Sequence, residues 1–553
     1  MRSSLTLLLV IGLSTHVRAQ QLEWLSHYGV PGQSSIPQGL LLAPDGDGHV
    51  YGARSFSGSP LNLDGNLLNS SVSQDLFVAK WDSAGHVIWA DGVEGDGHPF
   101  SLGESVYDVW YDPATQELLV TGSNDTEMEF DHDTLVDSGV DLDTYMFVAR
   151  YAADGECLWA RRGTGAYVSG LTILLDTGSN AYLFGQAPYG ATLHGQPDIV
   201  VPNGGYYAKY SSTGDLLEAD RIITNGSVGG ATWLSTDQIV LAGGFAASGD
   251  LLGTSVVVSN ALGSGFLAVT DLLSTVDWLV PFHSTTGASV SDCVMASPNR
   301  IIVTGVFYDD LTLPTDTLHS PTGVLNGYIA SFDLQGDLLW LTQLASPLYA
   351  SHGGTLHVDD NGSIYVVGAF QGELNMGAVT LTATTGQQGF IARFDTMGVC
   401  QAAWDYGKVG NASGSIVPAS DGIYFSCVYD SACTIAEYAL DDPSGGQSFL
   451  MVAKIDSLNG FTGIPRAPMM GGELTIYANP NNGICTIDLP QSLQASDGLV
   501  LSVYDNTGLL VQRTPLEFND QGLKLDVRAQ AKGVYHVELS DGAQRYSGSI
   551  VFE

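Results

Sequence analysis

Basic residues are scarce in this sequence. It contains 19 Lys and Arg against 59 Asp and Glu among 553 residues, and its formal net charge is −40. A chain this acidic repels phosphate backbones and anionic headgroups, which argues against nucleic acid and anionic membrane as partners. A solvated surface suited to salty surroundings accounts for the acidity, and a store of multivalent cations is the alternative.

Long apolar runs are also missing, since no segment reaches the roughly 18 residues that a membrane helix requires. The apolar run at residues 5–13 follows Arg2 and precedes the small-x-small site Val17-Arg18-Ala19. This pattern predicts a secretory signal peptide over residues 1–19. Cleavage would remove Arg2 and Arg18, so the mature chain would carry 17 basic and 59 acidic residues, a charge of 17 − 59 = −42.

Cysteine is rare, and no pair has the CxxC spacing typical of metal sites. Cys427 and Cys433 are the two that lie close together, and export would permit a local disulfide between them. The others are expected to be small core residues: Cys157, Cys293, Cys400 and Cys485.

Catalytic signatures are absent. The sequence has no Gly-x-Ser-x-Gly, no His-Glu-x-x-His and no Gly-x-x-x-x-Gly-Lys motif. Several histidines lie in predicted turns and inserts without paired ligand spacing: His49, His86, His98, His132 and His194. The sequence therefore identifies no catalytic, cofactor-binding or metal residue, and it favours a binding protein over an enzyme.

Glycine, in contrast, is abundant at 67 residues, as expected of a chain with many turns. Residues 75–92 predict two strands, because their side chains alternate and Asp82-Ser83-Ala84-Gly85 fits a type I turn between them. The hairpin recurs at residues 145–161, 205–220, 265–280, 327–342 and 389–404, and residues 448–460 repeat its first strand and turn.

Two more strand-like segments precede each hairpin. In the first copy they are residues 39–43 and 49–54. The hairpin turns begin near positions 82, 152, 211, 271, 333, 395 and 456, a spacing of 59 to 62 after a first interval of 70. Seven four-strand repeats of this length predict an all-β, seven-bladed propeller over residues 20–463.

The seventh copy lacks its return strand, and residues 22–29 resemble it. Trp24 there matches Trp89, Trp159, Trp278 and Trp340. We expect the N-terminal strand to pair with the last blade, because this removes two open sheet edges. The recurring Trp is expected to fill the wedge between blades; the third copy has Glu218 in its place and the sixth has Ala402, with Trp404 two residues later.

Each blade carries an insert between its second and third strands, for example residues 61–73, 127–143, 311–325 and 374–386. These inserts should project at one end of the blades and carry binding specificity. Two carboxylate clusters are candidate calcium sites: Asp45 with Asp47, and a group in the second insert made of Asp131, Asp133, Asp137, Asp141 and Asp143. The alternative is that both clusters reflect turn chemistry, because tight turns prefer Asp and Gly. If neither calcium nor a chelator changes the melting temperature, calcium binding at these clusters is excluded.

Residues 464–472 predict a linker, and about seven short strands after it predict a small Ig-like β-sandwich over residues 473–553. This part resembles the C-terminal sorting domain of the type IX secretion system of Bacteroidota. The resemblance lies in Tyr477-Ala478-Asn479-Pro480, in Val503-Tyr504-Asp505-Asn506-Thr507-Gly508 and in Lys532-Gly533-Val534-Tyr535. It implies export across both membranes through the secretion machinery, with release or display at the cell surface. Ala478 departs from the Pro common in the family.

Residues 20–463 are similar to the β-propeller repeats of bacterial secreted proteins, a resemblance that implies no activity. We therefore expect a secreted or surface-displayed scaffold that binds or adheres to an extracellular glycan or protein. A secreted enzyme that degrades polysaccharide or protein is the alternative, and a purely structural surface protein is the third.

Overall fold

The computed structural model divides the chain into two compact units, Met1–Gly463 and Ile464–Glu553. Each unit is described by itself. The predicted signal peptide and nearly all of the predicted linker lie outside the described residues. The structure describes residues 22–30, 39–56, 60–70, 75–95, 104–124, 127–130, 134–135, 144–258, 263–297, 299–408, 414–429, 433–435, 438–440, 448–455, 472–488, 500–505, 510–515, 523–528, 530–540 and 545–553.

The described residues form strands and turns and contain no helix, so the all-β prediction is confirmed. The described residues of the first unit form seven main sheets, which we number in chain order; each is built on four strands, and four of them gain two further strands from an insert hairpin. The first four sheets are β2 (Leu41–Pro44), β3 (Val50–Phe56), β6 (Asp75–Trp81) and β7 (Val87–Gly95); β8 (Ser105–Asp112), β9 (Glu117–Asn124), β12 (Tyr145–Tyr151) and β13 (Cys157–Thr164); β14 (Ser169–Leu175), β15 (Ala181–Ala187), β18 (Gly204–Tyr210) and β19 (Leu216–Ile223); β20 (Gly226–Trp233), β21 (Gln238–Phe245), β24 (Ser264–Asp271) and β25 (Thr275–Ser284).

The last three sheets follow the same plan, but the seventh takes its fourth strand from the N-terminus. They are β26 (Gly287–Ser297), β27 (Arg300–Tyr308), β30 (Leu325–Phe332) and β31 (Leu338–Leu344); β32 (Tyr349–Val358), β33 (Ile364–Met376), β34 (Val379–Phe394) and β35 (Cys400–Lys408); β36 (Ser415–Ala419), β37 (Gly422–Tyr429), β40 (Ser448–Ile455) and β1 (Leu22–Val30).

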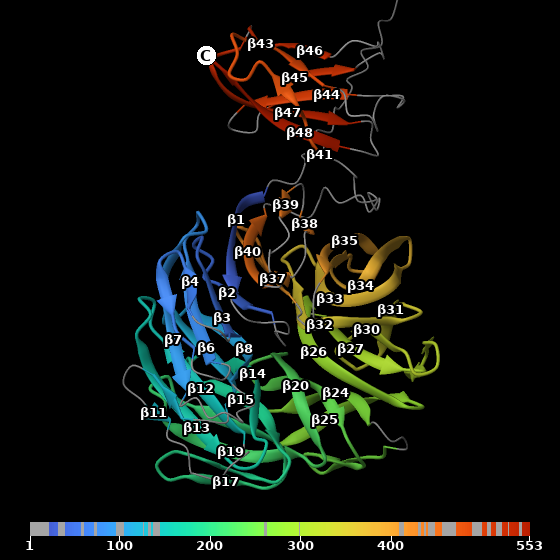
Figure 1. Ribbon diagram of the computed structural model, residues 1–553. Helices are drawn as coiled ribbons and strands as arrows, with labels where there is room; N and C mark the ends of the chain where they lie inside the picture. The colour runs from blue at the N-terminus through green and yellow to red at the C-terminus, as the bar shows by residue number, and fades with distance from the viewer. Residues whose placement is uncertain are drawn as a thin grey trace, which may run out of the picture. The chain divides into compact units, whose positions relative to one another are not determined.

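The first strand of each sheet, which we call its inner strand, contacts the inner strand of the next sheet. The series runs β2, β8, β14, β20, β26 and β32 (Figure 1) and continues with β36, which in turn contacts β2. Apolar side chains of neighbouring sheets pack together: Ala53 and Val78 of the first sheet share one core with Val120 and Ala149 of the second. Burial between sheets thus stabilises the unit along its whole circuit.

The predicted pairing of the N-terminal strand is confirmed. β1 pairs antiparallel with β40, with Leu25 opposite Ala453 and Ser26 opposite Val452. The Lys454 ammonium lies 3.0 Å from the carboxylate of Glu23 and 2.9 Å from that of Asp421. The first described strand of the chain is therefore the fourth, outer strand of the seventh sheet.

The recurring Trp fills the space between neighbouring sheets, as predicted. Each ring covers the glycine of the next sheet's hairpin turn, so closely that a β-carbon there would lie within 3 Å of it. The indoles of Trp89, Trp159, Trp278 and Trp340 also donate to a backbone carbonyl of that turn, as from Trp89 to Ala153 at 3.0 Å. The pairs are Trp24–Gly85, Trp89–Gly155, Trp159–Gly214, Trp278–Gly336 and Trp340–Gly398.

The inserts were predicted to project at one end of the blades, and the structure adds a pairing that the sequence analysis did not predict. Each of four insert hairpins pairs sideways with the outer strand of the preceding sheet, because that strand has an unpaired edge. These hairpins are β10 (Met128–Glu129) with β11 (Thr134–Leu135), β16 (Ala191–Leu193) with β17 (Ile199–Val201), β22 (Gly249–Leu251) with β23 (Thr254–Val256), and β28 (Asp310–Thr312) with β29 (Thr317–His319). Two further hairpins are β4 (Leu61–Leu63) with β5 (Asn66–Leu68), and β38 (Cys433–Ile435) with β39 (Tyr438–Leu440).

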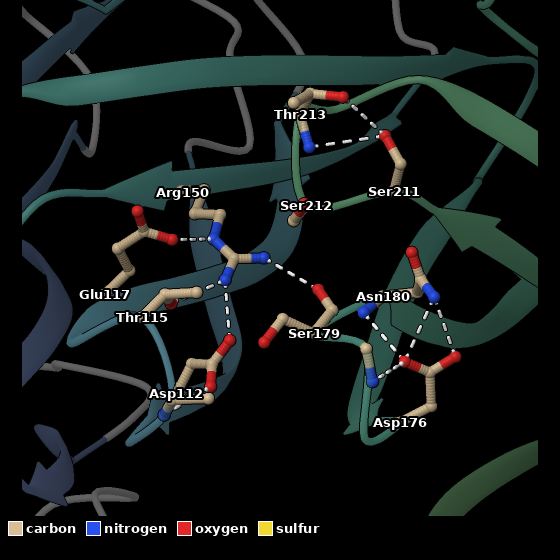
Figure 2. Close-up of polar contacts among 12 residues, drawn as sticks. Asp112, Thr115, Glu117, Arg150, Asp176, Ser179, Asn180, Ser211, Ser212 and Thr213 are labelled. Carbon is tan, nitrogen blue, oxygen red and sulfur yellow. Dashed lines mark hydrogen bonds and ion pairs between the residues drawn. The ribbon is translucent and has the colours of Figure 1, made fainter.

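A buried cation on the third strand of the second sheet connects this sheet to the third sheet. Arg150 on β12 is fully buried, and its guanidinium lies 2.6 Å from Asp112 and 2.5 Å from Glu117 (Figure 2). The same guanidinium donates to the Ser179 carbonyl of the third sheet at 3.0 Å. This network links the second sheet to the third, and its charges are paired as buried charges must be.

The second unit consists of two sheets that enclose one apolar core. Leu501, Val537 and Ile550 of the larger sheet pack there with Cys485 and Leu525 of the smaller one. The larger sheet has the order β41 (Gly472–Glu473), β48 (Arg545–Phe552), β47 (Gly533–Ser540), β44 (Val500–Asp505) and β45 (Leu510–Pro515), and the smaller has β42 (Ile476–Tyr477), β43 (Ile484–Ile487) and β46 (Leu523–Asp526).

Candidate functional site

All seven inner strands contribute to one cavity of about 570 Å³. Its size is that of a small-molecule site. The lining is mostly apolar or small, as predicted for the inner strands, but it includes Asp108, Asp292 and His357. Tyr107 and Trp110 of β8 also line the cavity, and 36% and 40% of their surfaces are exposed.

Asp108 and Asp292 occupy equivalent positions in the second and fifth sheets. Each follows an irregularity of the inner strand, where the pairing shifts between Val106 and Asp108 and between Val290 and Asp292. A β-bulge of this kind redirects a side chain. Both carboxylates accept from the backbone N–H of the next residue at 2.8 Å.

Each carboxylate also accepts from the inner strand of the next sheet. Asp108 accepts from the Ile173 N–H at 2.8 Å and from the Thr172 hydroxyl at 3.1 Å. Asp292 accepts from the Leu356 N–H at 3.1 Å. Inner strands expose unpaired N–H groups towards the cavity, and these two acids satisfy some of them.

The environment favours the protonated form of both acids. Burial raises the pKa of Asp108 to about 6. Burial likewise raises the pKa of Asp292 to about 8, and the negative charge of Asp108 acts in the same direction. Both side chains are only half-buried, since the cavity reaches them while protein surrounds their other sides. Desolvation outweighs the hydrogen bonds that favour the charged form.

Burial acts on His357 in the opposite sense, because here the charged form is the protonated one. It lowers the pKa of His357 to about 4, so the imidazole is neutral at pH 7. The cavity therefore combines one neutral imidazole, two carboxyl groups with raised pKa values and two partly exposed aromatic rings. Such a set can hold or exchange a proton and can contact a ring-shaped ligand.

The structure uses Asp45 for turn geometry. One carboxylate oxygen accepts from the backbone N–H groups of Asp47 at 2.9 Å and His49 at 3.1 Å. The other lies 3.0 Å from the His49 ring and 3.7 Å from the Lys80 ammonium. Asp47 points to solvent. These contacts favour the turn interpretation of this pair, and calcium binding there stays a prediction for chelator experiments.

Other sequence-based candidates lie outside the described residues. They are Asp131, Asp133, Asp137, Asp141, Asp143, His98 and His132. The side chain of Cys433 also lies outside them, so its pairing with Cys427 stays a prediction. Among the residues that the structure describes, no three His, Cys, Asp or Glu side chains gather as a metal site would require.

Sequence reasoning missed Asp108 and Asp292. The signal was a single acid within an otherwise apolar inner strand, in Val106-Tyr107-Asp108-Val109 and again in Val290-Ser291-Asp292-Cys293. The repeat places both at the same point, just after the bulge. Strict alternation of side chains cannot predict the direction of either acid, because the bulge interrupts that alternation.

Comparison with solved structures gives distant neighbours, each 10% identical. A polysaccharide lyase of family PL25, an ulvan lyase, has a TM-score of 0.29 over 96% of this chain and 95% of its own. A member of the DUF4221 family from Bacteroides vulgatus has a TM-score of 0.30 over 79% of this chain and 97% of its own. An ACO/RPE65 chimera has a TM-score of 0.30 over 76% of this chain and 94% of its own. No curated protein shows significant similarity to the sequence.

The described residues contain no helix that is long and apolar enough to cross a membrane. Residues 475–553, which form nearly all of the described second unit, match the family model of the secretion system C-terminal sorting domain. The C-terminal part of this chain thus belongs to the type IX sorting-domain family, and the protein is secreted or held at the outer cell surface.

Proposed function

We propose that the first unit is a seven-bladed β-propeller that binds an extracellular ligand in its central cavity and acts as a binding or adhesion scaffold. The observation that carries this proposal is the cavity itself, to which all seven inner strands contribute. The contact of β36 with β2 supports a complete circuit of blades. An Ig-like sorting sandwich would deliver this unit to the surface after removal of a signal peptide.

The proposal predicts that a filled cavity no longer binds. Thr232 lines the cavity and is half-buried, so Thr232→Trp places an indole in the ligand space. Thr317→Trp, on an exposed insert strand, is the matched control. Binding of the labelled full chain to immobilised polysaccharides and to cells should fall at least tenfold for the first variant and stay unchanged for the second. Equal binding by both variants, with unchanged melting temperatures, would contradict a site in the cavity.

Degradation of a polymer is the second candidate, and the raised pKa of Asp292, together with its place in the cavity, favours it. A carboxyl group that is protonated near neutral pH can act as a general acid. This candidate predicts release of products from polysaccharide or protein, with loss of turnover in Asp292→Asn while binding persists. Binding without any product would leave the scaffold function.

A further inference from the structure

Two hollows on the first unit lie next to each other, and the inner one adjoins the central cavity; we call the two hollows together the groove. The outer hollow, of about 640 Å³, lies between Thr164, Tyr189 and Val200. The inner hollow, of about 460 Å³, is lined by residues of the third, fourth and fifth sheets. Pro188 and Asn203 line both hollows, and Gly229 lines both the inner hollow and the central cavity.

An exposed aromatic pair stands at the outer end of this groove. Tyr189 is 74% exposed and Tyr167 is 50% exposed, and their ring centroids lie 6.2 Å apart with the planes tilted by 47°. Two large aromatic rings that are exposed to water do not contribute to stability through burial, and exposed apolar surface of this kind marks interaction sites. Tyrosine offers a rigid amphipathic surface for a ligand at low entropic cost.

The backbone holds this pair in place. Tyr167 has a φ of 60°, a conformation that side chains other than Gly and Asn seldom adopt and that is enriched at functional sites. Gly165 permits the approach, because a β-carbon there would lie 2.5 Å from the carbonyl oxygen of Gly190. The segment that carries Tyr167 thereby lies against the turn that carries Tyr189.

The lining of the groove carries no charged residue, although the chain has 59 acidic residues. Its polar side chains are amides and hydroxyls, and Gly226 and Gly244 add half-buried backbone to the lining. In the part of the chain that the structure describes, the side chains of Gln186 and Ser227 make no hydrogen bond. They are thus available to a ligand that both donates and accepts.

We propose that this groove binds a segment of a neutral polysaccharide, with sugar rings stacked on Tyr189 and Tyr167 and the chain directed towards the central cavity. Sugar rings present apolar C–H faces to aromatic rings and hydroxyl edges to amides, which matches the lining. An anionic polymer would meet the repulsion of the acidic surface without a compensating cation in the groove. A protein segment would be expected to place an apolar anchor in a buried pocket, and the outer hollow is open.

This inference rests on the proposed ligand-binding function and names its ligand class and a second contact surface. The test is affinity electrophoresis of the full chain through gels that contain a neutral β-glucan, xyloglucan or mannan, with polygalacturonate and ulvan as anionic polymers. Retardation by one neutral polymer is expected. Tyr189→Ala should weaken it about tenfold, whereas Tyr189→Phe, which keeps the ring, should retain it. Leu339→Ala, an exposed side chain on β31 of the fifth sheet, is the control.

The outcomes separate the groove from the proposed function. If a neutral polymer retards the wild type and Tyr189→Ala equally, the groove is not the polysaccharide site, but the ligand-binding function of the protein stands. Retardation only by anionic polymers, or capture of a protein partner that Tyr189→Ala abolishes, would overturn the neutral-glycan assignment. Absence of retardation by every polymer would overturn it as well, and absence of cell binding in addition would overturn the scaffold function.

Discussion

Trp24 lies directly against the α-carbon of Gly85, so that a β-carbon on Gly85 would be 2.5 Å from the Trp24 ring. The Ser26 hydroxyl, two residues on, donates to the Gly85 carbonyl at 2.6 Å. Trp24 belongs to the seventh sheet and Gly85 to the first, so the contact joins the two ends of the repeat array in the same way that Trp89 and Gly155 join the first two sheets.

Gly85→Ala should destabilise the first unit. Gly85 has a φ of 84°, so an alanine there is strained by about 1–2 kcal/mol, and overlap with Trp24 adds roughly 1–3 kcal/mol. Gly65→Ala is the matched control, because Gly65 has a φ of 97° with no atom within 4 Å of the added carbon. Differential scanning calorimetry should show a clearly larger fall in melting temperature for Gly85→Ala. Equal falls would mean that the Trp24 contact contributes nothing.

Arg150→Met should destabilise the first unit by about 3–5 kcal/mol, because the buried carboxylate of Asp112 loses its partner. Addition of Asp112→Asn should restore part of that loss, since it removes the unpaired charge. Urea unfolding monitored by tryptophan fluorescence measures both effects. Arg528→Met is the control: its ion pair with Asp526 is exposed in the second unit, so no measurable change is expected. A double variant no better than Arg150→Met would contradict the charge argument.

Asp292 should make the first unit less stable as pH rises. Its pKa of about 8 in the folded state exceeds the unfolded value of about 3.9. The folded chain therefore binds the extra proton, and the resulting stability, complete below pH about 4, is lost as pH rises through about 8. Melting temperatures between pH 5 and 9 should fall less for Asp292→Asn than for the wild type.

Asp47→Asn is the control for this series, since Asp47 is exposed in a turn.

His357 should lower the stability of the first unit at acidic pH. Its pKa is lowered to about 4 in the folded state, so the stability that the neutral imidazole contributes is lost as pH falls from about 6.5 towards 4. His357→Gln should remove that acid-side loss only. An unchanged alkaline profile in Asp292→Asn would show that Asp292 does not hold a proton in the cavity.

Deletion of residues 475–553 should retain the first unit in the periplasm, because this segment is the sorting domain. Cell fractionation and surface labelling of a strain that expresses the truncated chain would measure the effect. An internal substitution such as Leu339→Ala should leave surface delivery intact. Normal surface appearance of the truncated chain would contradict a role for this domain in export.

The repeat made much of the fold predictable. Turns such as the one at Asp82, where the Gly85 N–H donates to the Asp82 carbonyl at 3.0 Å, recur in the hairpin turns that end at Gly155, Gly214, Gly336 and Gly398. The hairpin of the fourth sheet differs, because Leu272 and Leu273 both have positive φ. The match of Trp24 with Trp89 correctly predicted the pairing of β1 with β40. Both features are short sequence patterns that recur along the chain. Segments that share such a pattern can therefore be predicted to share a structure.

The candidate site was not predictable in the same way. Asp108 and Asp292 act across sheets, through backbone N–H groups of Ile173 and Leu356 that no sequence pattern marks. The prediction that the inserts project at one end did not include their pairing with a neighbouring sheet, such as that of β16 with the edge of β13 in the preceding sheet. Such pairing depends on which sheets lie next to each other, and the alternation of side chains within one strand does not encode this.

The pairing of β1 with β40 sets an order of events during synthesis. The seventh sheet needs Leu22–Val30, which is made early, and Ser448–Ile455, which is made after almost all of the first unit. Closing so long a loop is slow and has a large entropic cost. The first unit therefore cannot complete its seventh sheet until synthesis has reached the residues that immediately precede the sorting domain.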